Sequence, residues 1–295
     1  MNELLRTLVS GLGNGSAYAL LALGFVIIYK ATRVISFAQP AFMLAGAVLV
    51  SFLAGPVGFV PAVVLGVAGV ALLALGVERA VVRPMVGRPV FVVAIITLGI
   101  DIALRVVVNG FIGTDVLQVG DPWGLGRVEL LGVRVQERHL AAILTTAVVI
   151  AVLFVFFKYS RLGLAMRAAS FDQETALSQG VSVGAVFALS WAIAGGLAAV
   201  SGIFVATGGG IDQQMWIVAL KALPAIILGG LDSLGGAVVG GLTIGVVESL
   251  VSAYQGDFAP WLGQNFSVVS PYVVMLLVLL VRPYGLFGTR EVERV

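Results

Sequence analysis

Charged residues are scarce in this 295-residue sequence, and the scarcity excludes the commonest class of protein. Asp, Glu, Lys and Arg make up 11% of the chain and hydrophobic residues 60%, whereas soluble globular domains carry about 25% charged and about 45–50% apolar residues. The chain is therefore not an ordinary soluble enzyme. Its 17 basic and 15 acidic residues nearly balance, so the basic excess of a nucleic-acid-binding protein is missing and no nucleic acid partner is expected.

Cysteine is absent and histidine occurs once, as His139. The first absence excludes disulfides, thiolate metal sites and a cysteine nucleophile. The second excludes a metal site made of several histidines from one chain. No Gly-Lys pair occurs, so the phosphate loop G-x-x-x-x-G-K-[ST] is missing, as are G-x-S-x-G and H-E-x-x-H. We expect no metal, no cofactor bound by this chain, no ATPase site of its own and no enzymatic activity.

Long apolar runs dominate what remains. A membrane-spanning helix needs about 20 mostly apolar residues. Runs of suitable character lie at 8–29, 34–54, 57–77, 90–110, 139–157, 185–206, 217–231, 235–253 and 268–282. They predict an all-α membrane protein, a single transmembrane domain over 1–295 with about nine helices, or eight if the short run 217–231 is re-entrant. Three glycines and Asn14 crowd positions 11–15, so we expect the outer third of the first run to be irregular.

The basic residues of the short loops predict the orientation. Eleven of the 17 lie in four segments that alternate runs place on one side: Lys30, Arg33, Arg79, Arg83, Arg88, Lys158, Arg161, Arg167, Arg282, Arg290 and Arg294. The opposite side holds four: Arg6, Arg127, Arg134 and Arg138. This bias predicts a cytoplasmic C-terminus and an external N-terminus, which agrees with nine spans.

Two loops are long enough to carry structure of their own. The outer loop, about 111–138, has mixed charges and turn residues and is expected to form an ordered cap. The inner loop, about 158–184, contains good helix formers and ends at Gly180, the position of a C-cap glycine. We expect one short amphipathic helix there, which is either an interfacial connector or a docking helix for a cytoplasmic partner.

Four charged residues fall within the apolar runs, where charges are costly and often functional. Asp101 and Arg105 are spaced i, i+4 and can pair on one helix face. Lys221 and Glu248 can neutralise each other and join the seventh and eighth runs. For both pairs the alternative is a role in a polar path. Glycines at 236, 240, 241 and 245 form a small-residue face on the eighth run, which is typical of close helix packing.

Uncharged polar groups also interrupt the apolar runs. Asn14, Tyr18, Gln39 and Thr97 either hydrogen-bond neighbouring helices or contact a small polar solute that crosses the bilayer. With Phe37, these residues are the candidate substrate path.

Four stretches, in order along the chain, resemble one family. They are residues 13–47 (GNGSAYALLALGFVIIYKATRVISFAQPAFMLAGA), 161–181 (RLGLAMRAASFDQETALSQGV), 221–250 (KALPAIILGGLDSLGGAVVGGLTIGVVESL) and 279–288 (LLVRPYGLFG). Together they are similar to the permease subunit of branched-chain amino acid type bacterial ABC importers. Two positions depart from the family pattern: residues 36–41 read Ser-Phe-Ala-Gln-Pro-Ala where the family has Asn-Phe-Ala-His-Gly-Glu, and Asp232 replaces a glycine.

The resemblance implies a function and a set of partners. The chain would be the membrane subunit of an importer in the bacterial plasma membrane, paired with a second permease, identical or related. It would receive solute from an external binding protein and be driven by two cytoplasmic ATPase subunits, which bind the ATP. Docking of the ATPases is expected at Gly163, Arg167, Ala168, Asp172, Ala176 and Gly180. The solute is most simply a branched-chain amino acid, but other amino acids, urea, amides and small carboxylates remain open, and Pro40 is expected to kink the second helix.

Two other classes compete with this hypothesis. A stand-alone secondary transporter or channel would need carboxylates near the midplane, and only Asp101 and Glu248 are available. An intramembrane enzyme would need a catalytic constellation, which one histidine at the edge of a run does not supply.

Overall fold

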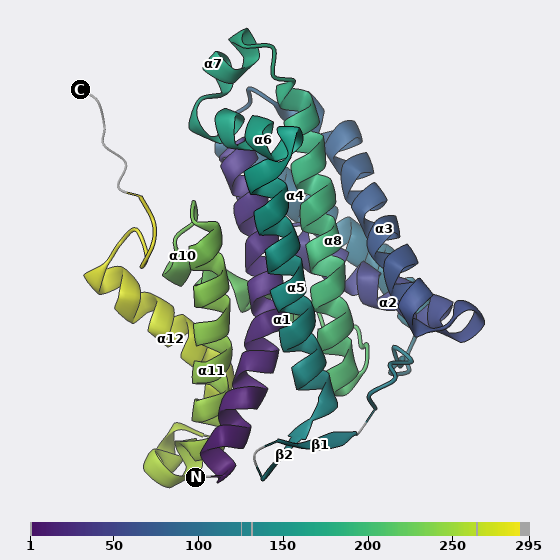
Figure 1. Cartoon of the computed structure of the whole chain (residues 1–295), viewed down its shortest axis with the longest axis vertical. Helices are drawn as coiled ribbons and strands as arrows, with labels where there is room; N and C mark the ends of the chain where they lie inside the picture. The colour runs from purple at the N-terminus through teal and green to yellow at the C-terminus, as the bar shows by residue number, and fades with distance from the viewer. Residues whose placement is uncertain (1, 125, 131, 264, 290–295) are drawn as a thin grey trace.

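The computed structural model describes residues 2–124, 126–130, 132–263 and 265–289, and most of them are helical (Figure 1). Seven helices are long and apolar enough to cross a membrane. Their bounds are α1 (Asn2–Thr32), α2 (Gln39–Val57), α3 (Phe59–Val77), α4 (Val90–Ile112), α5 (Glu137–Tyr159), α8 (Val183–Gly209) and α11 (Leu234–Phe258). Arg290 and Arg294, two of the basic residues used for orientation, lie outside the described residues.

The remaining helices are shorter. The run at 217–231 forms two pieces, α9 (Ile217–Leu220) and α10 (Ala222–Gly229), and the last run forms α12 (Phe266–Val281). Helix α3 continues through a π-helical turn, η1 (Glu78–Val82), and a 3-10 turn, η2 (Arg83–Met85); a second 3-10 turn, η3 (Pro260–Leu262), precedes α12. The buried Glu78 carboxylate accepts bonds from the Arg83 guanidinium at 3.0 and 3.1 Å, which secures this irregular end.

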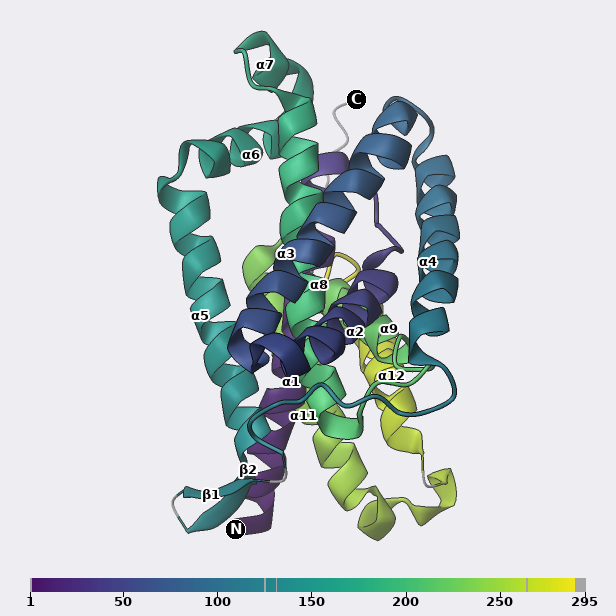
Figure 2. The same ribbon diagram turned by 90° about the vertical axis from the view of Figure 1, so that its right-hand side faces the viewer.

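Helix α1 runs through the centre of the molecule, between α8, α5 and α11 (Figures 1 and 2). It is one continuous helix, so the expectation of an irregular outer third is wrong. Its glycines serve close packing instead. A Cβ added to Gly15 would stand 2.8 Å from the Leu242 Cα of α11, and one added to Gly11 would stand 2.8 Å from the Val246 Cα.

The small-residue face of α11 divides into two seams. Gly241 and Gly245 face α1, and a Cβ on Gly245 would overlap the backbone of Gly15. Gly236 and Gly240 face α10, and a Cβ on either would overlap a backbone carbonyl of that helix. Helix α11 therefore contacts one neighbour on each side at backbone distance, as small residues allow.

Helix α2 begins later than its apolar run. Residues 33–38 are not helical, Arg33 has a positive φ of 58°, and the helix starts at Gln39 inside the protein. Pro40 lies in the first turn of α2, so the predicted kink is wrong. Proline is tolerated there because the first amide groups of a helix have no partner within it.

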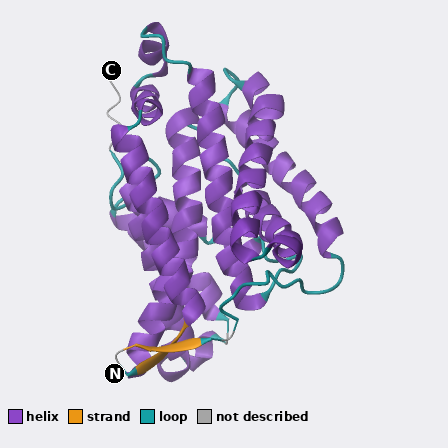
Figure 3. Cartoon of the chain, turned by 45° about the vertical axis from the view of Figure 1, so that its right-hand side comes forward, coloured by secondary structure: helices purple, strands orange, loops and turns teal. Residues whose placement is uncertain are grey.

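Both long loops contain secondary structure in their described residues. The inner loop forms two helices, α6 (Arg161–Phe171) and α7 (Gln173–Ser178), because Asp172 adopts an extended conformation and caps α7. The outer loop contains an antiparallel hairpin of β1 (Arg127–Leu130) and β2 (Val133–Gln136), with Arg127 opposite Gln136. The hairpin corrects the all-α expectation, and it lies at the N-terminal end of the molecule (Figure 3).

The opposite end of the molecule holds the ends of α1, α3 and α5 and the start of α4, and with them three of the four basic segments (Figures 1 and 2). Side chains cross-link them there: Arg33 donates to the Ser170 carbonyl, Arg83 to the Gly184 carbonyl and Lys30 to the Asp232 carbonyl. We refer to this end as the basic end and to the other as the hairpin end.

Candidate functional site

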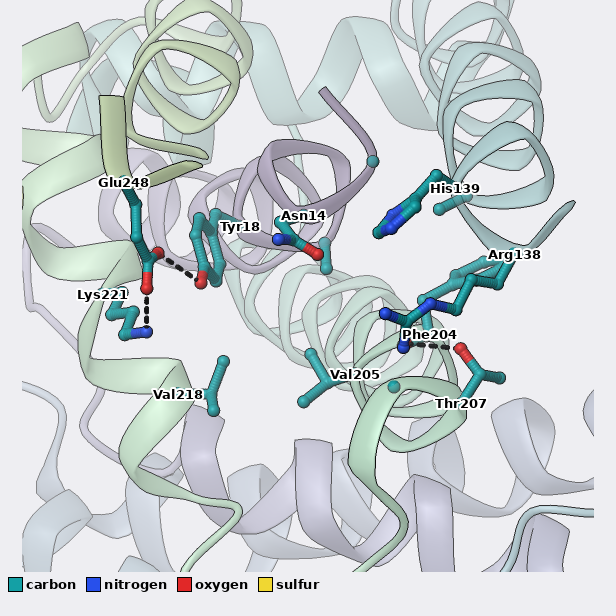
Figure 4. Close-up of a pocket in the computed structure, with 14 residues that line it drawn as sticks. Asn14, Tyr18, Arg138, His139, Phe204, Val205, Thr207, Val218, Lys221 and Glu248 are labelled. Atoms are coloured by element: carbon teal, nitrogen blue, oxygen red, sulfur yellow. Dashed lines mark hydrogen bonds and ion pairs between the residues drawn. The ribbon is translucent and has the colours of Figure 1, made fainter. Parts of the chain in front are cut away.

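A polar cavity of about 250 Å³ lies among α1, α5, α8 and α11, beside the α9–α10 break (Figure 4). It is nearer the hairpin end, because α5 begins there with Arg138 and His139. The lining residues are Gly13, Asn14, Ala17, Tyr18, Arg138, His139, Ala142, Phe204, Val205, Thr207, Gly208, Val218, Lys221 and Glu248. Four predicted site residues, Asn14, Tyr18, Lys221 and Glu248, thus meet at one cavity.

One wall is a hydrogen-bonded charge network. The Tyr18 hydroxyl donates to Glu248 Oε2 at 2.7 Å, and the Lys221 ammonium is paired with Glu248 Oε1. Lys221 lies between α9 and α10, and its side chain joins this junction to α11. The network gives each oxygen of the Glu248 carboxylate one hydrogen-bond partner, and it holds three chain segments together.

The opposite wall carries two residues that the sequence patterns did not single out. Arg138 donates from Nε to the Gln136 side chain at 2.6 Å, and its terminal nitrogens lie toward Thr207. Its guanidinium is packed against Gly208, where a Cβ would overlap it. His139 is packed against Gly13, whose Cβ would stand 2.5 Å from the ring Nδ1. An arginine followed by a histidine at the start of an apolar run was the available signal, but this pattern is equally typical of a loop boundary.

The second charge pair forms a separate polar cluster. Asp101 Oδ2 accepts from Arg105 at 2.8 Å, and Oδ1 accepts from the Ala41 amide at 3.0 Å in the first turn of α2. The Arg105 guanidinium carbon lies 3.9 Å from the centre of the Trp216 ring. This cluster caps the buried start of α2, because an anionic group is favourable at a helix N-terminus.

The other predicted path residues belong to that junction and not to the cavity. Thr97 accepts from the Phe37 amide at 3.0 Å. Gln39 and Thr97 are fully buried, and among the residues that the structure describes no group hydrogen-bonds the Gln39 side-chain amide. The candidate path thus separates into a cavity group and a buried junction group.

The predicted coupling residues lie on α6, α7 and the turns around them. Gly163 is buried against the end of α5, whereas Arg167 and Ala168 are exposed. The exposed Asp172 accepts from the Thr175 hydroxyl at 2.6 Å, and this bond, with the Thr175 amide, lowers the pKa of its carboxyl. Ala176 is buried, and Gly180 has a φ of 82°, the left-handed conformation of a C-cap glycine.

Within the described ranges, no group of three or more His, Cys, Asp or Glu side chains is placed to hold an ion. The site offers paired charges, hydroxyls and an amide around a small cavity, a set suited to binding a polar solute.

Comparisons with known proteins indicate a transport family. Residues 7–279 match the family described as the permease component of branched-chain amino acid transport systems. The chain is 29% identical to the high-affinity branched-chain amino acid transport system permease protein LivH of Escherichia coli K12, over 99% of this chain and 97% of that protein. It is 28% identical to the corresponding permease protein BraD of Pseudomonas aeruginosa, over 99% and 98%.

One solved structure has a similar fold. The chain matches a chain of PsaBC from Streptococcus pneumoniae in complex with Fab, with a TM-score of 0.50 and 14% identity. The match covers 96% of this chain and 93% of that one, so the likeness extends over the whole fold.

Proposed function

This chain belongs to the family of permease components of branched-chain amino acid transport systems, and we propose that it is the membrane-spanning subunit of a bacterial ABC importer for an amino acid. It is a multi-pass membrane protein, and its relatives are transport components and not enzymes. The importer would use ATP hydrolysis in two separate cytoplasmic subunits. A second permease, identical or related, and an external binding protein would complete it.

The observation that carries the proposal is the exposed apolar surface of α6 and α7. Leu162, Leu164, Phe171 and Leu177 are all exposed, and Phe171 is 89% exposed. Both helices lie at the basic end, where α7 stands beyond the ends of the spanning helices and α6 follows the end of α5 (Figures 1 and 2), so we place their apolar side chains outside the lipid tails. Exposed apolar side chains outside the membrane mark a protein contact, and we assign the contact to the ATPase subunit.

The coupling residues have distinct parts in this assignment. Gly163 and Ala176 fix α6 and α7 to the bundle, Asp172 and Gly180 set the ends of α7, and Arg167 and Ala168 belong to the exposed surface. Movement of the ATPase against this rigid pair would reach α5 through Gly163 and α8 through Gly180. This is how ATP binding would change the access of the cavity.

We further propose nine passes, with the N-terminus outside and the C-terminus in the cytoplasm of the cell. The count depends on the segment 210–230. Ile211 forms a bridge with Leu117 of the outer loop, and Asp232 accepts from Lys30 at the basic end. These two anchors support a ninth pass by this segment, even though α9 and α10 are short. The basic end would be cytoplasmic because positive residues favour that side.

The test compares two exposed phenylalanines at opposite ends. We expect Phe171→Ser to release the ATPase subunits when the chain is purified in detergent with its genomic neighbours, because a polar residue removes the apolar anchor. Phe258→Ser, at a residue 82% exposed at the hairpin end, is the matched control and should retain them. Solute-stimulated ATP hydrolysis should fall in the first variant alone.

Either of two results would overturn the proposal. One is recovery of the unmodified chain without ATPase subunits but active in liposomes under an ion gradient. The other is release of the ATPase subunits by both variants to the same extent.

A further inference from the structure

A polar groove of about 330 Å³ leads along α1 toward the cavity. Glu3, Thr7, Ser10 and Asn14 line it, and their spacing of three and four residues puts them on one face of α1. Ser249 and Ser252 of α11 line the other side, with Ser267. Arg6 also lines the groove, and a row of polar and charged groups of this kind is favourable where water or a polar solute reaches it.

The groove and the cavity adjoin each other at two shared residues. Both are lined by Asn14 and by Glu248. The groove begins at the N-terminal turn of α1, which is at the hairpin end, and the cavity lies further along the same helix. Polar lining residues therefore extend from the N-terminal turn of α1 to the charge network at Tyr18, Glu248 and Lys221.

The cavity separates opposite charges. Figure 4 shows Glu248 at one side and Arg138 at the other, with Asn14, Val205 and Val218 between them. Lys221 neutralises part of the Glu248 charge, but a carboxylate has more acceptor positions than its two present partners use. Three ion pairs occur in the part of the chain that the structure describes, and none includes Arg138. Asp121 of the outer loop attracts it from beyond ion-pair distance.

We propose that this cavity is a solute site for a zwitterionic α-amino acid, with Arg138 as the residue that selects the carboxylate. The ammonium group would lie on the Glu248 side, and an apolar side chain would lie against Val205 and Val218. A guanidinium is suited to this role because its planar donors match both carboxylate oxygens. The inference rests on the proposed function, and it excludes urea and amides, which have no carboxylate.

Two glycines of α8 give a test of the Arg138 position that leaves its charge in place. A Cβ at Gly208 would overlap the guanidinium, whereas one at Gly209 meets no atom within 4 Å. Gly208→Ala should therefore displace Arg138, and Gly209→Ala should not. The two substitutions are chemically identical and lie in the same turn.

The experiment uses the permease with its ATPase partners in nanodiscs and compares leucine with leucinamide, which lacks the carboxylate. The unmodified complex should bind leucine about ten- to a hundredfold more tightly than leucinamide, the range for one charged hydrogen-bonding group. Arg138→Gln should remove this preference by weakening leucine alone. Arg134→Gln, an exposed arginine on β2, should retain it.

The outcomes separate this inference from the proposed function. If ATPase subunits remain bound but Arg138→Gln and Gly208→Ala keep the full preference for leucine, the site assignment is wrong and the importer assignment stands. If the ATPases do not bind, leucine and leucinamide are compared on the purified chain by thermal shift, and equal shifts overturn the site. If Arg138→Gln does not fold, Gly208→Ala against Gly209→Ala decides: equal preference in both rejects the role of Arg138.

Discussion

In a soluble protein the more hydrophobic of two helices is usually the more buried one, and helices α1 and α5 show the reverse. The most apolar window of α1 has a mean hydropathy of 1.6 and 89% of it is buried inside the protein, whereas that of α5 has 2.9 and 11%. The more hydrophobic helix is therefore the more exposed one. High hydropathy in this chain goes with exposure on the outer surface, and the buried helix α1 owes its lower hydropathy to its glycines and polar residues.

The physical reason is that lipid, and not water, surrounds the outer faces of membrane-spanning helices. Lipid tails are as apolar as leucine, so burying a leucine between helices gains little from hydrophobicity, and close packing and hydrogen bonds decide which helices associate. Helix α1 contacts α11 through glycines and Glu248 through Tyr18. Helix α5 presents Leu144, Val148 and Val152 outward, where the requirement is only that they be apolar.

The largest expected effect tests the polar interior that α1 shares. Lys221→Met leaves Glu248 buried without its cation and should lower the free energy of unfolding by about 3–5 kcal/mol. Lys158→Met, at an exposed lysine at the end of α5, should change it by less than about 1 kcal/mol. Unfolding in mixed micelles measures both. The double variant Lys221→Met/Glu248→Gln should recover most of the loss, and failure to recover would show that the pair is not coupled.

The next effect tests packing at backbone distance. Gly245→Ala on α11 adds a Cβ where the Gly15 backbone lies and should destabilise the protein by about 3 kcal/mol, the upper end for overpacking. Gly256→Ala on the same helix meets nothing within 4 Å and should be neutral or stabilise it by up to about 1 kcal/mol, because alanine favours helix. A thermal shift assay compares them, and shifts of the same sign would contradict the seam.

The smallest effect compares one leucine in each helix. Leu21 of α1 is fully buried and Leu144 of α5 is 68% exposed. Leu21→Ala should cost about 2 kcal/mol, the low end for a core cavity, because the gain from leaving water is absent. Leu144→Ala should be close to neutral, since lipid contacts that position in the folded and unfolded chain. Equal losses in the same unfolding assay would mean that α5 is covered by protein.

Much of the helical content was predictable from the sequence because apolar runs need only composition to be recognised. All nine predicted runs contain helix, and the glycine at 180 ends α7 as its position suggested. The exceptions depend on particular hydrogen bonds: Asp172 divides the inner loop by capping α7, and Asp101 caps α2 from 60 residues away. Reasoning from neighbouring residues alone does not predict the bond between Asp101 and the Ala41 amide.

The candidate site was predictable where a polar or charged residue interrupts an apolar run, as Asn14, Tyr18, Lys221 and Glu248 do. Lys221 and Glu248 are opposite charges within apolar runs, so their pairing follows from the cost of leaving either alone. Arg138 and His139 lie at a run boundary, where a charge needs no explanation. Their contacts with Gly208 and Gly13 depend on how α5, α8 and α1 are arranged in space. The residues around Arg138 and His139 in the sequence do not predict that arrangement.

The glycine seams between α11 and its neighbours also decide where this protein is free to vary. A lipid-facing position accepts any of several apolar side chains, so many sequences meet its requirement equally well. A position whose neighbour is a backbone atom accepts one residue type. The glycines between α1 and α11 have no side chain, yet their identity is the most tightly constrained. Substitutions should therefore accumulate at the membrane-facing positions before they occur at these glycines.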